Sequence, residues 1–183
     1  MSLTRLFKSF AVALLALLAA GACLAADIVI KDRDDPVVQN MEARYELVMS
    51  AGASGDIATY RQYRTAAVIK ELEGCPRDKL CKAMWGGDPM KAMMGTAKIG
   101  AGLLKSEPFT LYEARIGDRA ARLAYESVKA GKERTDTTFV VILFEKTNND
   151  WKIGRVNFQS YVHGGSAPEK IEKYLTYPMN QFK

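Results

Sequence analysis

The sequence predicts an α+β fold in which N-terminal helices pack on a curved, antiparallel four-stranded meander. Apolar residues between Pro36 and Gly74 recur at helical spacing, whereas the chain from Phe109 to Val162 alternates as strands separated by short turns. Hydrophobic residues make up 48% of the 183 residues and charged residues 26%, which is typical of one globular domain with a core of its own. Helices followed by such a sheet pack as a layer on one of its faces.

Residues 1–26 have the features of a secretory signal peptide. Arg5 and Lys8 form a positive start, and the apolar stretch 10–20 is shorter than the roughly 20 residues of a membrane-spanning helix. We expect cleavage after Ala25 or Ala26. The prediction is a periplasmic or secreted protein with no membrane span once the signal is removed.

A lipoprotein is the alternative for this leader. Residues 20–23 resemble a lipobox, which would make Cys23 a lipid-bearing N-terminus and anchor the protein to a membrane. The small residues at the cleavage site favour plain secretion.

The charge balance does not favour nucleic-acid binding. Without Arg5 and Lys8 the 26 basic residues become 24, against 21 acidic ones, so the net charge is +3. Basic and acidic residues alternate, as in 31–35, whereas nucleic-acid binding needs a concentrated basic stripe.

The helical half divides at glycines and prolines. Asp35 caps a helix that starts at Pro36 and is broken by 51–55, and Asp56 caps a second helix that ends at Gly74. On the second helix one apolar face holds Ile57, Tyr60, Tyr63 or Arg64, Ala67 and Val68. Two short helices are expected near 76–85 and 89–97, followed by a loop over 100–102.

The second half is predicted to form four strands and a short C-terminal helix. The strands are expected over 109–116, 120–128, 137–146 and 151–162, joined by short turns as an antiparallel meander. A capping box at 166–169 predicts a last helix through Leu175. The domain is therefore expected to span 30–183.

This order of elements resembles the nuclear transport factor 2-like superfamily, which includes ketosteroid isomerase. Gly55-Asp56 opens a helix with tyrosines, and the strand Phe-Val-Val-Ile-Leu-Phe-Glu-Lys turns through Asn-Asn-Asp into Trp-Lys-Ile. The resemblance implies a cone-shaped domain with a pocket between sheet and helices. Members act as enzymes, binding modules or docking domains, so the resemblance does not choose a function.

The candidate ligand site combines Tyr60 with Arg155, Asn157 and Gln159. On the last strand these three polar residues alternate onto the face of Trp151, Ile153 and Tyr161. Polar side chains that point into a concave face need hydrogen-bond partners, because unpaired burial costs about 1–3 kcal/mol each. The alternative is that this face is the solvated side of the sheet.

No catalytic residue is assigned from the sequence. The resemblance implies an acid–base pair in the pocket, and the second hypothesis is an isomerase- or hydratase-like enzyme that uses Tyr60, Tyr125 or a strand carboxylate. Such a group must lie within hydrogen-bond reach of a substrate. His163, the only histidine, is interpreted as a solvated loop residue.

The cysteines and methionines are given structural roles. Cys75 and Cys81 are expected to form a disulfide, because their spacing fits neither a redox motif nor a zinc site. A second group, Met84, Met90, Met93 and Met94, is interpreted as core filler and not as a copper site. We expect no metal and no cofactor.

The leading hypothesis is an exported, non-catalytic domain. It binds a small apolar or amphipathic molecule in the periplasm or docks a protein partner, which includes a second copy of the chain in a homodimer.

Overall fold

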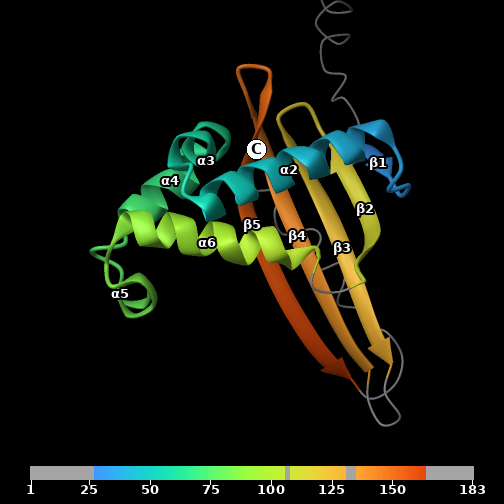
Figure 1. Ribbon diagram of the computed structural model, residues 1–183. Helices are drawn as coiled ribbons and strands as arrows, with labels where there is room; N and C mark the ends of the chain where they lie inside the picture. Colours follow the sequence, from blue (N-terminus) through green and yellow to red (C-terminus); the bar gives the residue numbers. More distant parts are fainter. Residues whose placement is uncertain (1–26, 106–107, 131–134, 164–183) are drawn as a thin grey trace, which may run out of the picture.

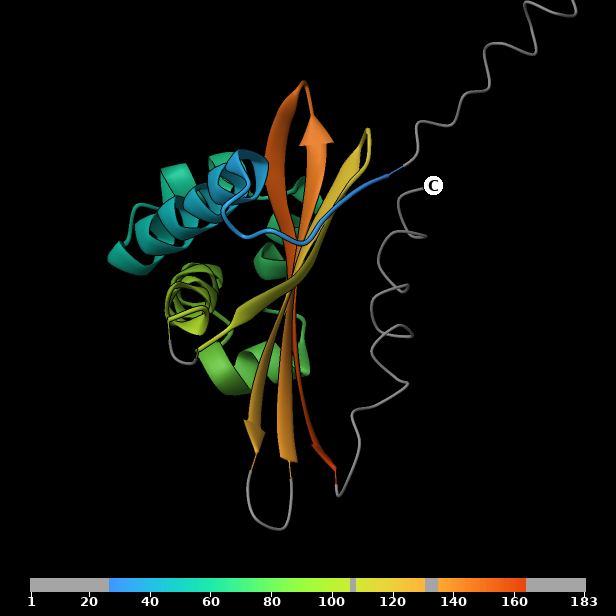
Figure 2. The same cartoon turned by 90° about the vertical axis from the view of Figure 1, so that its right-hand side faces the viewer.

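A five-stranded antiparallel sheet and five helices form the part of the chain that the computed structural model describes, residues 27–105, 108–130 and 135–163. Helices α2 and α6 lie on one side of the sheet (Figures 1 and 2). The sheet order follows the chain from β1 to β5 without a crossover. The predicted α+β class is confirmed. The elements in chain order are β1 (Ile28–Ile30), α2 (Pro36–Ser54), α3 (Ile57–Tyr63), α4 (Ala66–Glu73), α5 (Lys79–Trp85), α6 (Pro89–Leu103), β2 (Thr110–Ile116), β3 (Ala120–Ala130), β4 (Thr135–Thr147) and β5 (Asp150–His163).

The prediction of four strands was wrong by one. The additional strand, β1, is three residues long and pairs with the end of β2, where Ile28 is opposite Ile116. Three residues are too few to show an alternating pattern, so the sequence carries little signal for it. The signal peptide, Cys23 and the predicted C-terminal helix lie outside the described residues.

Two predicted helix boundaries were also wrong, and the first concerns the helix expected from Asp56 to Gly74. This segment is two helices, α3 and α4, separated by an extended Arg64 and by Thr65. The Thr65 amide donates to the Ile153 carbonyl of β5 at 3.0 Å. The break therefore attaches the helical layer to the edge of the sheet.

The second wrong boundary is the loop expected at 100–102, which is the last turn of α6. Gly100 lies where α6 approaches α2 closely, and a Cβ there would be 2.7 Å from Met49 Sδ. The Tyr45 hydroxyl donates to the Gly100 carbonyl at 3.0 Å. Glycine is needed at this position for helix packing, and its helix-breaking tendency is overridden by the tertiary contacts.

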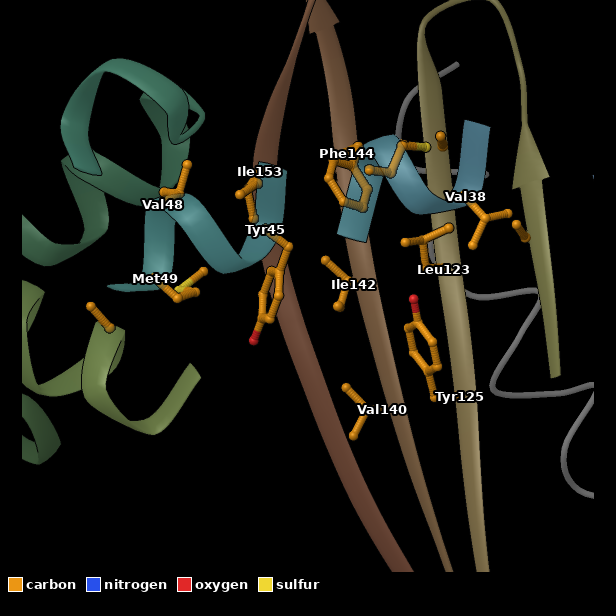
Figure 3. Packing of buried hydrophobic residues seen from close by; sticks show 14 of the residues in the cluster. Val38, Tyr45, Val48, Met49, Leu123, Tyr125, Val140, Ile142, Phe144 and Ile153 are labelled. Atoms are coloured by element: carbon orange, nitrogen blue, oxygen red, sulfur yellow. The ribbon is translucent and has the colours of Figure 1, made fainter. Parts of the chain in front are cut away.

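The main core lies between α2 and the sheet (Figure 3). Its buried residues from α2 follow helical spacing, and those from the strands share one face of the sheet. They include Val38, Met41, Tyr45, Val48 and Met49 of α2, together with Leu123, Tyr125, Val140, Ile142, Phe144 and Ile153 of the sheet. A smaller cluster of Ala124, Val141 and Leu143, with Tyr112 packed against it, lies apart from this core.

The predicted disulfide is confirmed. Cys75 and Cys81 are bonded, with Cα atoms 5.1 Å apart, and they close the loop between α4 and α5. Within the described ranges, no helix combines the length and the apolar character that a membrane span requires.

Candidate functional site

A cavity of about 660 Å³ lies between α4, α6 and β5. Small-molecule sites typically measure about 300–1,000 Å³ and have mostly apolar walls with a few polar groups. This cavity fits that description on both counts. The described residues that line it are Met49, Arg64, Val68, Glu71, Leu72, Thr96, Ile99, Gly100, Leu103, Arg155, Val156, Asn157 and Phe158.

The two helical walls come from regular helix spacing. On α6 the lining residues Thr96, Ile99, Gly100 and Leu103 stand at i, i+3, i+4 and i+7, which is one face of a helix. The wall from α4 includes Val68 and Leu72, four residues apart. The sequence thus places an apolar stripe of each helix toward the same space.

A β-bulge shapes the wall from β5. The register with β4 pairs Phe144 with Ile153 but Ile142 with Val156, so one extra residue lies in β5 between the two pairs. Ile153 and Val156 both pack with the main core as a result. The expectation of unbroken alternation from Trp151 to Tyr161 was therefore wrong, since the bulge shifts the alternation by one residue.

Arg64 is the buried cation of the cavity wall. The residue is only 5% exposed, and its Nε and Nη1 atoms have no hydrogen-bond partner among the described residues. Its guanidinium lies 5.3 Å from the centre of the Tyr60 ring. Burial lowers the pKa of Arg64, and the nearby Tyr60, Tyr45 and Glu71 oppose that shift. A buried charge without a counterion is energetically costly.

The second cation, Arg155, lies at the mouth. Its Nη2 atom donates to Glu71 Oε2 at 2.9 Å, and both side chains are more than 60% exposed. Two arginines and one glutamate are thus the charged residues in the described lining, which leaves an excess of one positive charge. Since Glu71 is paired with Arg155, that excess lies at Arg64.

The structure brings together two of the four predicted ligand residues. Arg155 and Asn157 both line the cavity, and both are exposed. Their expected place on the face of Ile153 was wrong: after the bulge Asn157 pairs with Val141, which belongs to the smaller cluster and not to the main core. Tyr60 is fully buried in contact with Arg64 and is not in the lining. The backbone of Gln159 pairs with Phe139 in the sheet, and the Gln159 side chain lies outside the described part.

Sequence reasoning did not identify Arg64 as a site residue. Its position was recognisable, because an arginine four residues after Tyr60 falls on the apolar face of the expected helix. What the sequence does not reveal is the helix break at Arg64, which fixes this residue at the edge of the sheet beside the cavity.

The residues of the enzyme hypothesis are not assembled at this cavity. The Tyr125 hydroxyl donates to Glu42 Oε1 at 2.7 Å, and burial together with this hydrogen bond raises the pKa of Tyr125. Neither Tyr125 nor Glu42 lines the cavity. The buried carboxylate Glu113, on strand β2, forms an ion pair with Arg122. The side chain of His163 is outside the described residues.

The methionines are divided between core and surface. Met93 is buried as expected, but Met84 and Met90 are 53% and 50% exposed, so the core interpretation was wrong for these two. Met84 lies on the short helix α5, and Met90 lies in the first turn of α6. Over the described ranges, no three His, Cys, Asp or Glu side chains are grouped so that they could hold a metal ion.

Comparisons with protein-family models, with curated proteins and with solved structures find no match for this chain. The resemblance to the nuclear transport factor 2-like superfamily therefore stays a prediction.

Proposed function

We propose that this chain is an exported, non-catalytic domain that binds a small apolar or amphipathic molecule in the cavity between α4, α6 and β5. The observation that carries the proposal is the cavity itself: about 660 Å³, with apolar walls from two helices and a strand and only a few polar groups. Filling it would remove apolar surface from water, which is worth about 25 cal/mol per Å².

Binding is favoured over catalysis by the chemistry of the lining. Among its described residues the one carboxylate is Glu71, which is exposed and already paired with Arg155. A general acid or base normally lies in a desolvated pocket, where burial tunes it toward the working pH. Glu71 is held instead as the partner of a cation.

Export is supported by two observations. Residues 1–26 resemble a signal peptide, and disulfides such as Cys75–Cys81 form and persist in oxidising compartments. The proposed compartment is the periplasm or the extracellular space.

The test uses a neutral, environment-sensitive dye, Nile red, as a probe of the apolar cavity. We expect saturable binding by the disulfide-bonded protein and a large loss of affinity in Ile99→Asp, because Ile99 lines the cavity and a carboxylate there opposes apolar binding. Leu47→Asp is the matched control. Leu47 is 56% exposed and Ile99 58%, but Leu47 lies on α2 and is not in the lining. Equal binding by the two variants would contradict the proposal.

A further inference from the structure

We infer that the ligand of this cavity carries a carboxylate and that Arg64 binds it, so that amphipathic monocarboxylates are preferred over neutral molecules of the same shape. This inference rests on the proposed function and adds a ligand class to it. Its basis is the guanidinium of Arg64 in the wall of a mostly apolar cavity, with Nε and Nη1 buried and without a hydrogen-bond partner among the described residues.

Among the described residues no carboxylate is hydrogen-bonded to Nε or Nη1 of Arg64. The Tyr60 ring, 5.3 Å away, offers a cation–π contact but no negative charge. Glu71 belongs to the lining, yet its Oε2 atom is bonded to Arg155. A buried charge that has lost its partner is strongly destabilising in proteins. Two of the three guanidinium nitrogens of Arg64 are buried with no hydrogen-bond partner among the described residues. An anion that binds in the cavity would compensate the positive charge of Arg64.

The chemistry of the guanidinium points to a planar anion. A guanidinium binds the two oxygens of a carboxylate through Nε and Nη2 or through Nη1 and Nη2. In Arg64 each of these pairs includes one nitrogen, Nε or Nη1, that has no hydrogen-bond partner among the described residues. A doubly charged phosphate would need further buried donors. The other cation of the lining, Arg155, is exposed and engaged with Glu71.

The rest of the cavity fits an apolar tail. Val68 and Leu72 on α4, Ile99 and Leu103 on α6, and Val156 and Phe158 on β5 surround the space with hydrocarbon. A ligand with one charged end and one apolar end would therefore place each end against matching side chains.

Arg64 is also held in position before any ligand arrives. Its backbone forms a bridge with Ile153 of β5, and the following Thr65 amide donates to the Ile153 carbonyl. Arg64 is the C-cap residue of α3, and the next residue, Thr65, is the N-cap residue of α4. Fixing the cation in advance lowers the ordering cost that binding would otherwise incur.

The experiment is displacement of Nile red by decanoate and by decan-1-ol, which share a chain and differ in charge. At about pH 7.5 the carboxylic acid is ionised, because an unperturbed carboxyl pKa is about 4. We expect decanoate to displace the dye at a concentration about ten to a hundred times lower than decan-1-ol does. This ratio corresponds to the free energy that hydrogen bonds to a charged group contribute. Equal displacement by both compounds would overturn the inference and leave the proposed apolar site standing.

The variant Arg64→Met tests whether Arg64 is the residue that causes the preference for decanoate. This variant should keep Nile red binding but lose the preference for decanoate, and Arg64→Lys should keep part of it because the charge remains. Arg61→Met is the control, since Arg61 is an exposed arginine on α3 whose partner is Glu73. A preference that survives in Arg64→Met would overturn the role of Arg64. Failure of wild-type protein to bind Nile red would reject the proposed function, and the inference with it.

Discussion

The guanidinium of Arg64 lies over the ring of Tyr60, and the Tyr60 hydroxyl, like Nε and Nη1 of Arg64, has no hydrogen-bond partner among the described residues. Tyr45, the other buried tyrosine that influences the pKa of Arg64, is different. Its hydroxyl donates to the Gly100 carbonyl at 3.0 Å. The two tyrosines beside this cation thus differ in whether the hydroxyl is hydrogen-bonded, which makes them a useful pair for comparison.

Replacing each tyrosine by phenylalanine should have opposite consequences. Tyr45→Phe removes a buried hydrogen bond, and we expect a loss of about 1 kcal/mol in the free energy of unfolding. Tyr60→Phe removes a hydroxyl that is buried without a partner, so stability should stay the same or increase. Urea denaturation of the two variants measures the difference. A larger loss in Tyr60→Phe than in Tyr45→Phe would show that the Tyr60 hydroxyl has a partner in solution.

How far the sequence predicts this structure depends on the range of the interactions. The start of α2 was predictable, because Asp35 accepts from the Val37 amide and Pro36 occupies the first helical position. These are local signals. The break at Arg64 was not predictable, because it is stabilised by a hydrogen bond to Ile153, which lies far along the chain.

The candidate site shows the same division. Arg155 and Asn157 were predictable as polar residues on a largely apolar strand. Arg64 gains its significance only when α4, α6 and β5 enclose a common space, and the bulge near Val156 changes which side chains face it. The place of Arg64 at the cavity and the bulge in β5 both depend on tertiary packing, which cannot be predicted from the periodicity of one sequence.

Glycines of α6 provide a second matched pair. At Gly95 a Cβ would lie 2.1 Å from Trp85 Cζ3, whereas at Gly102 it would meet nothing within 4 Å. Gly102→Ala should therefore stabilise the protein by up to about 1 kcal/mol, which is the helix preference of alanine over glycine. Gly95→Ala should destabilise it, because the Trp85 ring has to move. Thermal unfolding of both variants tests this, and stabilisation by Gly95→Ala would contradict the packing of α5 on α6.

The disulfide should contribute to stability without determining the fold. Closing the short loop between Cys75 and Cys81, six residues apart, is worth about 2 kcal/mol in the chain-entropy model. We expect the double variant Cys75→Ala/Cys81→Ala to unfold at lower urea concentration with an unchanged circular dichroism spectrum. Adding a reductant should shift the wild-type curve toward that of the variant and leave the variant unaffected. A wild-type curve that does not respond to reductant would contradict the expected contribution.

Stability should fall at alkaline pH because of the buried tyrosines. Burial raises the pKa of Tyr45 from 10.0 to about 12, and it also raises the pKa of Tyr60. A pKa that is higher in the folded than in the unfolded state gives stability that is fully present below the unfolded value. That stability is lost as pH rises through the folded value, so the decline should run from about pH 10 to 12. Urea denaturation across this range measures it. Tyr45→Phe should show a shallower decline, and an identical decline would contradict the assignment to Tyr45.

The ion pair at the cavity mouth should affect binding more than it affects stability. Arg155 and Glu71 are bonded at 2.9 Å but are mostly exposed, and exposed pairs contribute about 0–1 kcal/mol. Arg155→Gln should therefore leave the urea midpoint almost unchanged. It should weaken decanoate binding in two ways, because it removes one positive charge and frees Glu71 to compete for Arg64. Glu71→Gln should have the opposite effect and strengthen decanoate binding, with decan-1-ol affinity unaltered in both variants. If Arg155→Gln removed the preference for decanoate and Arg64→Met did not, the cation that holds the ligand would be Arg155 at the mouth and not Arg64 in the wall.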